Sequence, residues 1–129
     1  MDWNNIDTVL LDMDGTLLDL HFDNFFWLQH LPRRYSELHG IELTKARDNL
    51  QQRMASTQGT LNWYCTDFWS QQFDLDVVAL KREVMALINE RPQALDFLSA
   101  LSSHGKQRIL ITNAHRDSID IKFSVTAIE

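Results

Sequence analysis

Residues 9–19 read VLLDMDGTLLD, and this stretch decides the fold. The short aliphatic run over residues 8–11 is typical of a strand that is buried on both faces of a parallel sheet. Gly15 follows the second of two aspartates and favours a tight turn. The stretch therefore predicts a buried strand that ends at a pair of carboxylates, Asp12 and Asp14.

The chain beyond this strand carries helical patterns until a second strand follows. Helical signals fill residues 20–91. Pro32 is expected to disturb the first helical region and Gly40 to end it, and three further helices are expected to begin at Thr44, Asn62 and Asp76. A further helix is predicted from Pro92 to Gly105, then a second buried strand over residues 108–111, and then a last helix that begins near Arg116. A strand, a helix and a second strand in this order are typical of an α/β fold with a parallel sheet.

The helical stretch is too long for an ordinary crossover between parallel strands. We therefore expect an α/β fold that consists of two parts. Residues 1–19 and 92–129 would form a core with a sheet of about two strands. Residues 20–91 would form an all-helical subdomain that is inserted after the first strand.

Composition narrows the range of partners and cell compartments. The chain has 129 residues, a net charge of -6 and a single cysteine, Cys65, so no internal disulfide can form. The acidic balance argues against nucleic acid or an anionic membrane as a partner. No apolar run approaches the roughly 20 residues that cross a bilayer, and the N-terminus lacks a signal-peptide pattern. We therefore expect a cytoplasmic location.

Polar residues follow both predicted strands, at the edge where open α/β sheets bind ligands. Asp12 and Asp14 are two residues apart, so in an extended segment their side chains point the same way. They can hold Mg²⁺, or one can attack phosphorus while the other supplies a proton. Thr112 and Asn113 offer a hydroxyl and an amide to a phosphoryl oxygen. Taken alone, both pairs are also compatible with an ordinary turn or helix cap.

Two motifs carry a resemblance to a known family. Residues 9–19 resemble the first motif of the haloacid dehalogenase-like (HAD) superfamily, and residues 108–113, which read RILITN, resemble its second motif. Residues 60–65 and 105–110 also resemble the bacterial GMP/IMP nucleotidase group. The resemblance implies a HAD-like Rossmannoid sheet with a helical cap. It also implies a 5′-nucleotidase that hydrolyses purine monophosphates through an aspartyl-phosphate.

The resemblance also implies a role for each site residue. Asp12 would be the nucleophile and a Mg²⁺ ligand, and Asp14 would be the general acid/base and would bind Mg²⁺ through its backbone carbonyl. Thr112 would donate a hydrogen bond to the phosphoryl group, and the backbone N–H of Asn113 would assist. The implied cofactor is Mg²⁺, and the implied partner is a small-molecule phosphoester, in particular a purine nucleotide.

The family has two further motifs, a lysine and an acidic pair, which residues 114–129 do not supply. Lys122 lies on the helix after Thr112 and is not assigned the role of that lysine. We therefore interpret the chain as C-terminally truncated, weakly active or inactive, and able to associate through an exposed sheet edge. A non-catalytic remnant or binding module remains an alternative, and a phosphomutase is a less favoured one.

Overall fold

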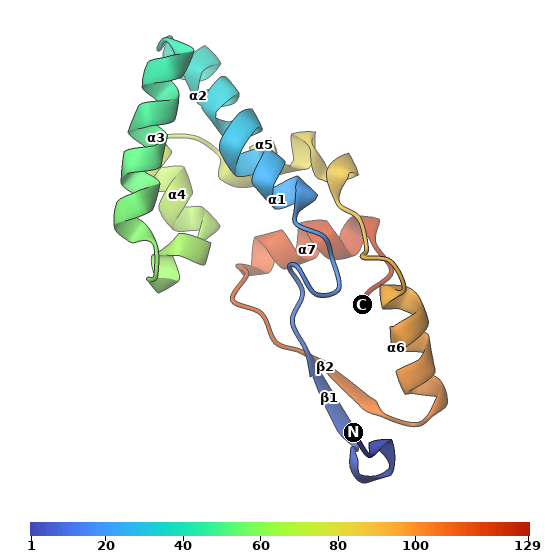
Figure 1. Cartoon of the computed structure of the whole chain (residues 1–129). Coiled ribbons are helices and arrows are strands. Elements are labelled where there is room, and N and C mark those ends of the chain that lie inside the picture. Colours follow the sequence, from blue (N-terminus) through green and yellow to red (C-terminus); the bar gives the residue numbers. More distant parts are fainter.

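The computed structural model describes all residues from 1 to 129 and shows a short strand pair with α6 beside it and the other α-helices beyond one end (Figure 1). None of the helices combines the length and the apolar character that a membrane span needs. Shorter 3-10 turns lie at Trp3–Asn5, Leu61–Tyr64 and Met85–Leu87. The strands and α-helices are β1 (Thr8–Leu11), α1 (His21–Phe25), α2 (Leu31–His39), α3 (Leu43–Thr57), α4 (Thr66–Phe73), α5 (Val77–Glu83), α6 (Ala94–Ser103), β2 (Gln107–Leu110) and α7 (Arg116–Val125).

The two strands form a parallel pair, as the sequence predicts. Leu11 lies opposite Leu110 in the register, and the backbone N–H of Ile111 donates to the carbonyl oxygen of Leu11 at 2.8 Å. Strand β2 begins and ends one residue earlier than predicted. Because the strands are parallel, their carboxyl ends meet at one edge, which faces the helices α1 and α7 (Figure 1).

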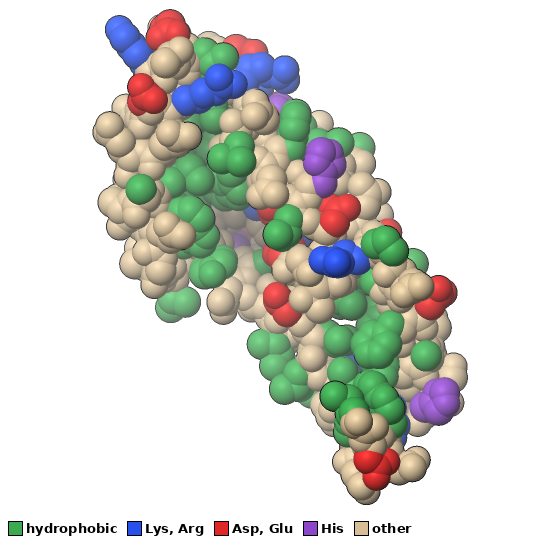
Figure 2. Space-filling view, in the orientation of Figure 1, with side chains coloured by type: hydrophobic (Ala, Val, Ile, Leu, Met, Phe, Trp, Pro, Cys, Tyr) green, Lys and Arg blue, Asp and Glu red, His purple; other side chains and the backbone are tan.

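The expectation that both strands are buried on both faces was wrong. Helix α6 lies along one face of the pair, and no element covers the other (Figure 1). Alternation along the strand buries Leu11 but leaves the side chain of Leu10 61% exposed, and Ile109 and Ile111 are also exposed. Figure 2 shows hydrophobic side chains gathered at this end of the molecule.

Helix α1 continues without a break into α2, although Pro32 was expected to disturb it. The Asp19 carboxylate accepts a hydrogen bond from the backbone N–H of His21 at 3.0 Å, where the helix begins. A π-helical turn over Phe26–His30 widens the helix just before Pro32, which lacks a backbone N–H. Gly40, with φ of 64°, ends α2 as predicted.

The other helix starts agree in part with the sequence. The Asp76 carboxylate caps α5 as predicted and accepts from the backbone N–H of Ala79. Helix α3 is capped by Glu42 rather than by Thr44. The helix expected from Asn62 begins later, at Thr66, after a 3-10 turn.

Two separate clusters of buried side chains hold the molecule together. In what we call the sheet part, β1, the loop after it, α6 and α7 pack around Leu11, Met13, Leu17, Leu18, Phe22, Ile88, Ala94, Leu98, Leu101, Ile121 and Ile128. In what we call the helical part, α2 to α5 pack around Phe26, Leu31, Tyr35, Ala46, Leu50, Trp69, Phe73, Val77 and Leu80. Phe22 and Ile88 belong to the first cluster although they lie within residues 20–91, and the domain boundaries stay a prediction.

The exposed leucine on β1 gives a first testable prediction. We expect the chain to self-associate through the uncovered strand pair, and Leu10→Lys to weaken this association at least about tenfold by placing a charge on an apolar contact. Sedimentation velocity over a concentration series measures the effect. Leu38→Lys, which changes a leucine on α2 that is 55% exposed, is the matched control and should leave association unchanged. Equal behaviour of the two variants would contradict the prediction.

Candidate active site

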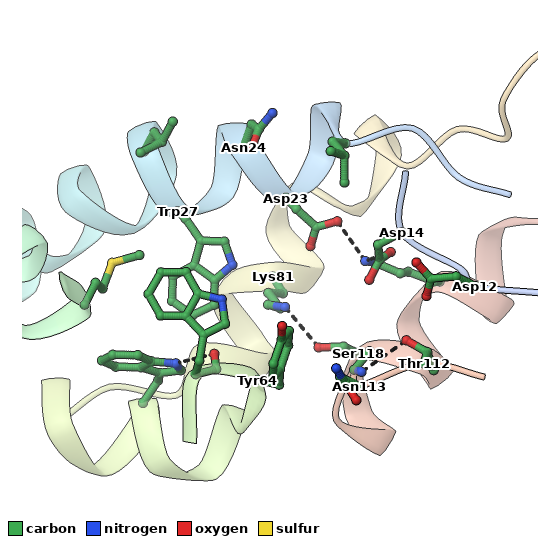
Figure 3. Close-up of a pocket in the computed structure, with 17 residues that line it drawn as sticks. Asp12, Asp14, Asp23, Asn24, Trp27, Tyr64, Lys81, Thr112, Asn113 and Ser118 are labelled. Atoms are coloured by element: carbon green, nitrogen blue, oxygen red, sulfur yellow. Dashed lines mark hydrogen bonds and ion pairs between the residues drawn. The ribbon is translucent and has the colours of Figure 1, made fainter. Parts of the chain in front are cut away.

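A cavity of about 490 Å³ opens between the sheet part and the helical part (Figure 3). It lies at the carboxyl ends of the parallel strands, where the sequence predicted a site. All four residues that were predicted for the site line this cavity, namely Asp12, Asp14, Thr112 and Asn113. The fold thus brings together residues that are about a hundred positions apart in the chain.

Asp12 directly follows β1, and its side chain is exposed at the cavity. Met13 is fully buried in the sheet part, so the alternation of the segment turns the neighbouring aspartates away from the core. The carbonyl oxygen of Met13 accepts hydrogen bonds from Leu17 and Leu18, and Gly15 adopts a φ of 79° in this turn. The Asp12 carboxylate forms no hydrogen bond or ion pair with another group of the protein, so its oxygens are available to a ligand.

Asp14 is held by a buried lysine. The Lys122 ammonium group donates to Asp14 at 2.5 Å and to Asp23 at 2.8 Å, and the Lys122 side chain is only 2% exposed. Burial raises the pKa of Asp14, and the positive charge of Lys122 opposes this shift. The environment of Asp14 therefore favours its protonated form.

A second buried lysine, Lys81 on α5, reaches the cavity from the helical part. Its ammonium group donates to the hydroxyl of Ser118 at 2.9 Å and lies 5.4 Å from the ring centre of Trp27. The rings of Phe22 and Phe26 are also within 6 Å. No carboxylate pairs with it, so burial lowers the pKa of Lys81 to about 8.

Thr112 and Asn113 form the start of the turn that leads from β2 into α7. The Thr112 hydroxyl accepts a hydrogen bond from the backbone N–H of Ala114 at 3.1 Å. Thr112 therefore shapes a local turn, as the simpler interpretation expected, and also lines the cavity. The N-cap of α7 is His115 rather than Thr112 or Asn113, and the contact of these two residues with a phosphoryl group stays a prediction.

Sequence reasoning missed four residues of the cavity wall. It gave Lys122 no role, whereas the structure places the Lys122 ammonium group beside Asp14. It also passed over Asp23, Lys81 and Ser118. The one signal in the sequence is that Ser118 and Lys122 are four positions apart, on one face of a helix. That spacing does not reveal which partners the side chains meet.

The oxygen atoms at this site fit a hard divalent cation. Mg²⁺ is bound in proteins by one or two carboxylates together with water or phosphate oxygens. Asp12 offers a free carboxylate, and the backbone of Asp14 runs through the same cavity wall. The Asp14 carboxylate itself is engaged by Lys122, so the donor set fits best with Asp12 as the side-chain ligand.

The two buried lysines should differ in their effect on stability. Lys122→Met removes the partner of Asp14 and Asp23 and should lower the free energy of unfolding by about 3 kcal/mol. Lys81→Met, the matched control, removes a buried charge that has no carboxylate partner and should be neutral or stabilising by about 1–3 kcal/mol. Urea unfolding of both variants measures the difference. A larger loss for Lys81→Met than for Lys122→Met would contradict it.

The lowered pKa of Lys81 also predicts a pH dependence. Between about 8 and the ordinary value of 10.5, the folded chain holds the amine neutral while the unfolded chain binds the proton. The unfolded state then binds more protons, so stability rises with pH through this window. Below a pH of about 8, Lys81 is charged in both states, so the full free-energy cost of burying its charge lowers the stability of the folded chain. We expect the stability gap between Lys81→Met and the unmodified chain to shrink from pH 7 to pH 10. A gap that is constant with pH would refute this.

Comparisons with known proteins agree with this geometry. The GMP/IMP nucleotidase YrfG of Escherichia coli (strain K12) is 44% identical over 127 residues, which make up 98% of this chain and 57% of that protein. The YrfG protein of Shigella flexneri matches to the same extent. In the solved structures, a HAD phosphatase from Thermococcus onnurineus superposes with a TM-score of 0.81 at 22% identity, over 95% of this chain and 58% of that one.

These matches cover nearly the whole chain but little more than half of each relative. The likeness to the archaeal phosphatase confirms the fold class, an α/β fold of the HAD type with two parallel strands. The family model of the haloacid dehalogenase-like hydrolases matches residues 6–124, which include both motifs at the cavity. The chain therefore belongs to the haloacid dehalogenase-like hydrolase family.

Proposed function

We propose that this site, in the complete protein, hydrolyses purine nucleoside monophosphates through an aspartyl-phosphate. One observation carries the proposal: Asp12, Asp14 and Thr112 line a single cavity at the carboxyl ends of the parallel strands. The substrate class is supported by the 44% identity to a GMP/IMP nucleotidase.

In the first step, a carboxylate oxygen of Asp12 attacks phosphorus, and the bond from phosphorus to the leaving oxygen breaks. Asp14 transfers its proton to that oxygen, so the nucleoside leaves as a neutral alcohol. The raised pKa of Asp14 favours the protonated form that this step needs. In the second step, water attacks the aspartyl-phosphate while Asp14 takes up a proton, which releases phosphate and restores Asp12.

Other groups at the cavity would neutralise and orient the phosphate or position Asp14. Mg²⁺, held by the Asp12 carboxylate and the backbone carbonyl of Asp14, would neutralise negative charge on the phosphate. The Thr112 hydroxyl and the backbone N–H of Asn113 orient the phosphoryl oxygens. Lys122 fixes the orientation of Asp14 through its hydrogen bond, and its charge offsets part of the local negative charge.

The wall that faces these residues suits a flat aromatic group. Trp27, Trp63 and Tyr64 line it, and Figure 3 labels Trp27 and Tyr64. An aromatic wall with a few polar groups is typical of sites that bind a purine. Asn62, which lies in the same 3-10 turn as Trp63 and Tyr64, is not among the lining residues.

The isolated 129-residue chain should turn over slowly. The family resemblance assigns a further lysine and an acidic pair to the reaction, and the chain does not supply them. Phosphoryl transfer depends on positioning and charge neutralisation, so missing groups of this kind lower the rate by orders of magnitude. We therefore propose full activity only for a protein that also contains the part of the nucleotidase relatives that this chain does not cover.

Phosphate release tests this proposal. The chain is assayed alone, and also fused to the part of the E. coli relative that it does not cover, with IMP, GMP and a hexose phosphate. We expect the fusion to prefer the nucleotides and to lose activity with EDTA. In the fusion, Asp12→Asn should reduce turnover beyond detection, and Asp14→Asn should slow it by about 10²–10⁴-fold.

The outcomes separate the competing functions. Full Mg²⁺-dependent turnover by the 129-residue chain would contradict its proposed weakness, while a preference for the hexose phosphate would refute the substrate class alone. A folded fusion without turnover would favour a binding module. Retention of the phosphate with transfer back to a sugar would favour a phosphomutase.

Tyr64 gives a separate prediction on specificity. Tyr64→Ala should lower kcat/KM for IMP about tenfold, because a base loses one aromatic face, while hydrolysis of p-nitrophenyl phosphate changes little. Leu61→Ala is the matched control, since Leu61 lies in the same 3-10 turn but is 83% exposed and outside the cavity wall. Steady-state kinetics of the fusion with both substrates measures the ratio. An unchanged ratio for Tyr64→Ala would rule out this contact.

A further inference from the structure

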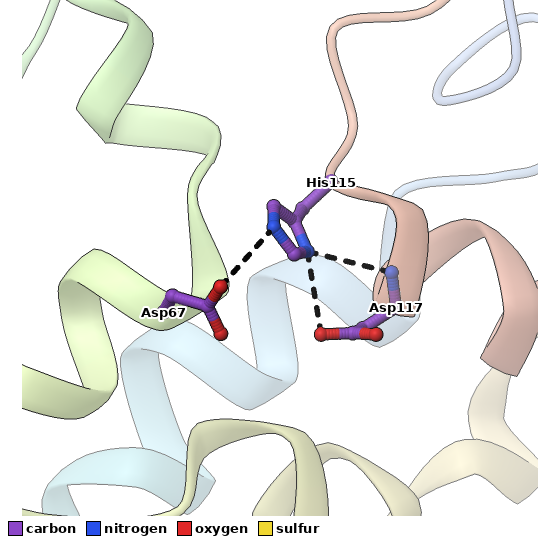
Figure 4. A group of neighbouring side chains, drawn as sticks. All are labelled: Asp67, His115 and Asp117. Atoms are coloured by element: carbon purple, nitrogen blue, oxygen red, sulfur yellow. Dashed lines mark hydrogen bonds and ion pairs between the residues drawn. The ribbon is translucent and has the colours of Figure 1, made fainter.

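A second group of side chains with metal-binding chemistry lies where the helical part meets the sheet part (Figure 4). Asp67 comes from the first turn of α4, His115 caps the start of α7, and Asp117 lies in the first turn of α7. The candidate ligand atoms of these three residues lie within 4.8 Å of one another. None of the three lines the cavity that holds Asp12 and Asp14.

The charge of this cluster is not balanced by the protein. The only ion-pair partner of Asp67 and of Asp117 is His115, and no lysine or arginine is within reach of either carboxylate. The hydroxyl of Thr66, a residue that is only 2% exposed, points into the cluster and lies 2.9 Å from Nδ1 of His115. One imidazole, two carboxylates and a buried hydroxyl thus offer a mixed set of nitrogen and oxygen donors at one place.

We infer that Asp67, His115 and Asp117 form a binding site for a transition-metal dication, with Zn²⁺ as the preferred ion. Imidazole together with carboxylate oxygens suits Zn²⁺, Co²⁺ or Ni²⁺, whereas Mg²⁺ prefers oxygen ligands alone. Three protein ligands and a fourth position open to water match a common coordination of Zn²⁺.

The ring of His115 contacts both carboxylates directly, and the two carboxylates have to rotate before an ion can bind between them. Nε2 of His115 lies 3.7 Å from the Asp67 carboxylate, while Nδ1 accepts from the backbone N–H of Asp117 and lies 3.4 Å from the Asp117 carboxylate. One ion binds only one ring nitrogen, so Nε2 is the ligand atom and the Asp117 carboxylate has to turn toward it. Zn²⁺ binds nitrogen and oxygen ligands at roughly 2.0–2.2 Å, which places ligand atoms about 3–3.5 Å apart. The side chains of Asp67 and Asp117 are 74% and 40% exposed, so rotation of their carboxylates meets little obstruction.

A metal at this position would clamp the two parts of the molecule together. Asp67 is carried by α4, which packs through Trp69 in the helical part, and His115 and Asp117 are carried by α7, which packs through Ile121 in the sheet part. His115 also follows Thr112 closely in the chain, so the ion would fix the turn that shapes one wall of the cavity. Bound metal should therefore hold this turn and α4 in a fixed arrangement.

Metal titration of the 129-residue chain tests the site without any need for turnover. We expect calorimetry to show one Zn²⁺ per chain, thermal unfolding to shift upward with Zn²⁺, and bound Co²⁺ to give a visible absorption band. Mg²⁺ at millimolar concentration should not displace Zn²⁺. Asp67→Asn and His115→Gln should each weaken Zn²⁺ binding at least tenfold, with folding checked by circular dichroism.

Three control variants distinguish this site from others in the chain. Asp12→Asn, which alters the Mg²⁺ site, and His104→Gln, which alters an exposed histidine at the end of α6, should leave Zn²⁺ affinity unchanged. Cys65→Ser should also leave it unchanged, since its thiol accepts from the backbone N–H of Phe68. The inference is overturned if Zn²⁺ does not bind, if Asp67→Asn binds it as well as the unmodified chain, or if Asp12→Asn or Cys65→Ser abolishes binding.

Discussion

The rest of the site depends on the ion pairs that the buried ammonium group of Lys122 forms with Asp14 and Asp23. This lysine joins Asp14, in the loop after β1, to Asp23 on α1, and it comes from α7 at the other end of the chain. Three elements thus meet at one charged centre, in which the lysine is almost fully buried and both carboxylates are partly exposed at the cavity. Removing one member of such a centre leaves an uncompensated buried charge, which is why the three elements are held in one arrangement.

The same centre sets the electrostatics of the cavity. Asp12 and Asp14 are neighbours in one motif, yet one carboxylate faces the open cavity and the other is partly buried against Lys122. Burial moves the pKa of Asp14 upward, and this separates a group suited to attack from a group suited to donate a proton. Two carboxylates of one motif can thus divide the work because their surroundings differ.

Prediction from sequence succeeded where the signal was local or where the order of elements restricts the topology. The parallel pairing followed from the order of elements, and the caps at Asp76 and Gly40 followed from residue type. It failed where distant contacts decide. Strand β1 looks like a strand buried on both faces, but a pair of strands with a helix on one side leaves Leu10 in solvent. Pro32 is accommodated within a continuous helix because a π-helical turn precedes it.

By itself, the sequence determined the family and four residues that line the cavity, because residues 9–19 and 108–113 are contiguous motifs at the ends of strands. Only the tertiary structure decided that Lys122 meets Asp14, that Lys81 is buried without a carboxylate partner, and that His115 lies between Asp67 and Asp117. The physical reason is that a motif constrains neighbours along the chain. The charge that surrounds a side chain is set by helices that pack against it from elsewhere in the sequence.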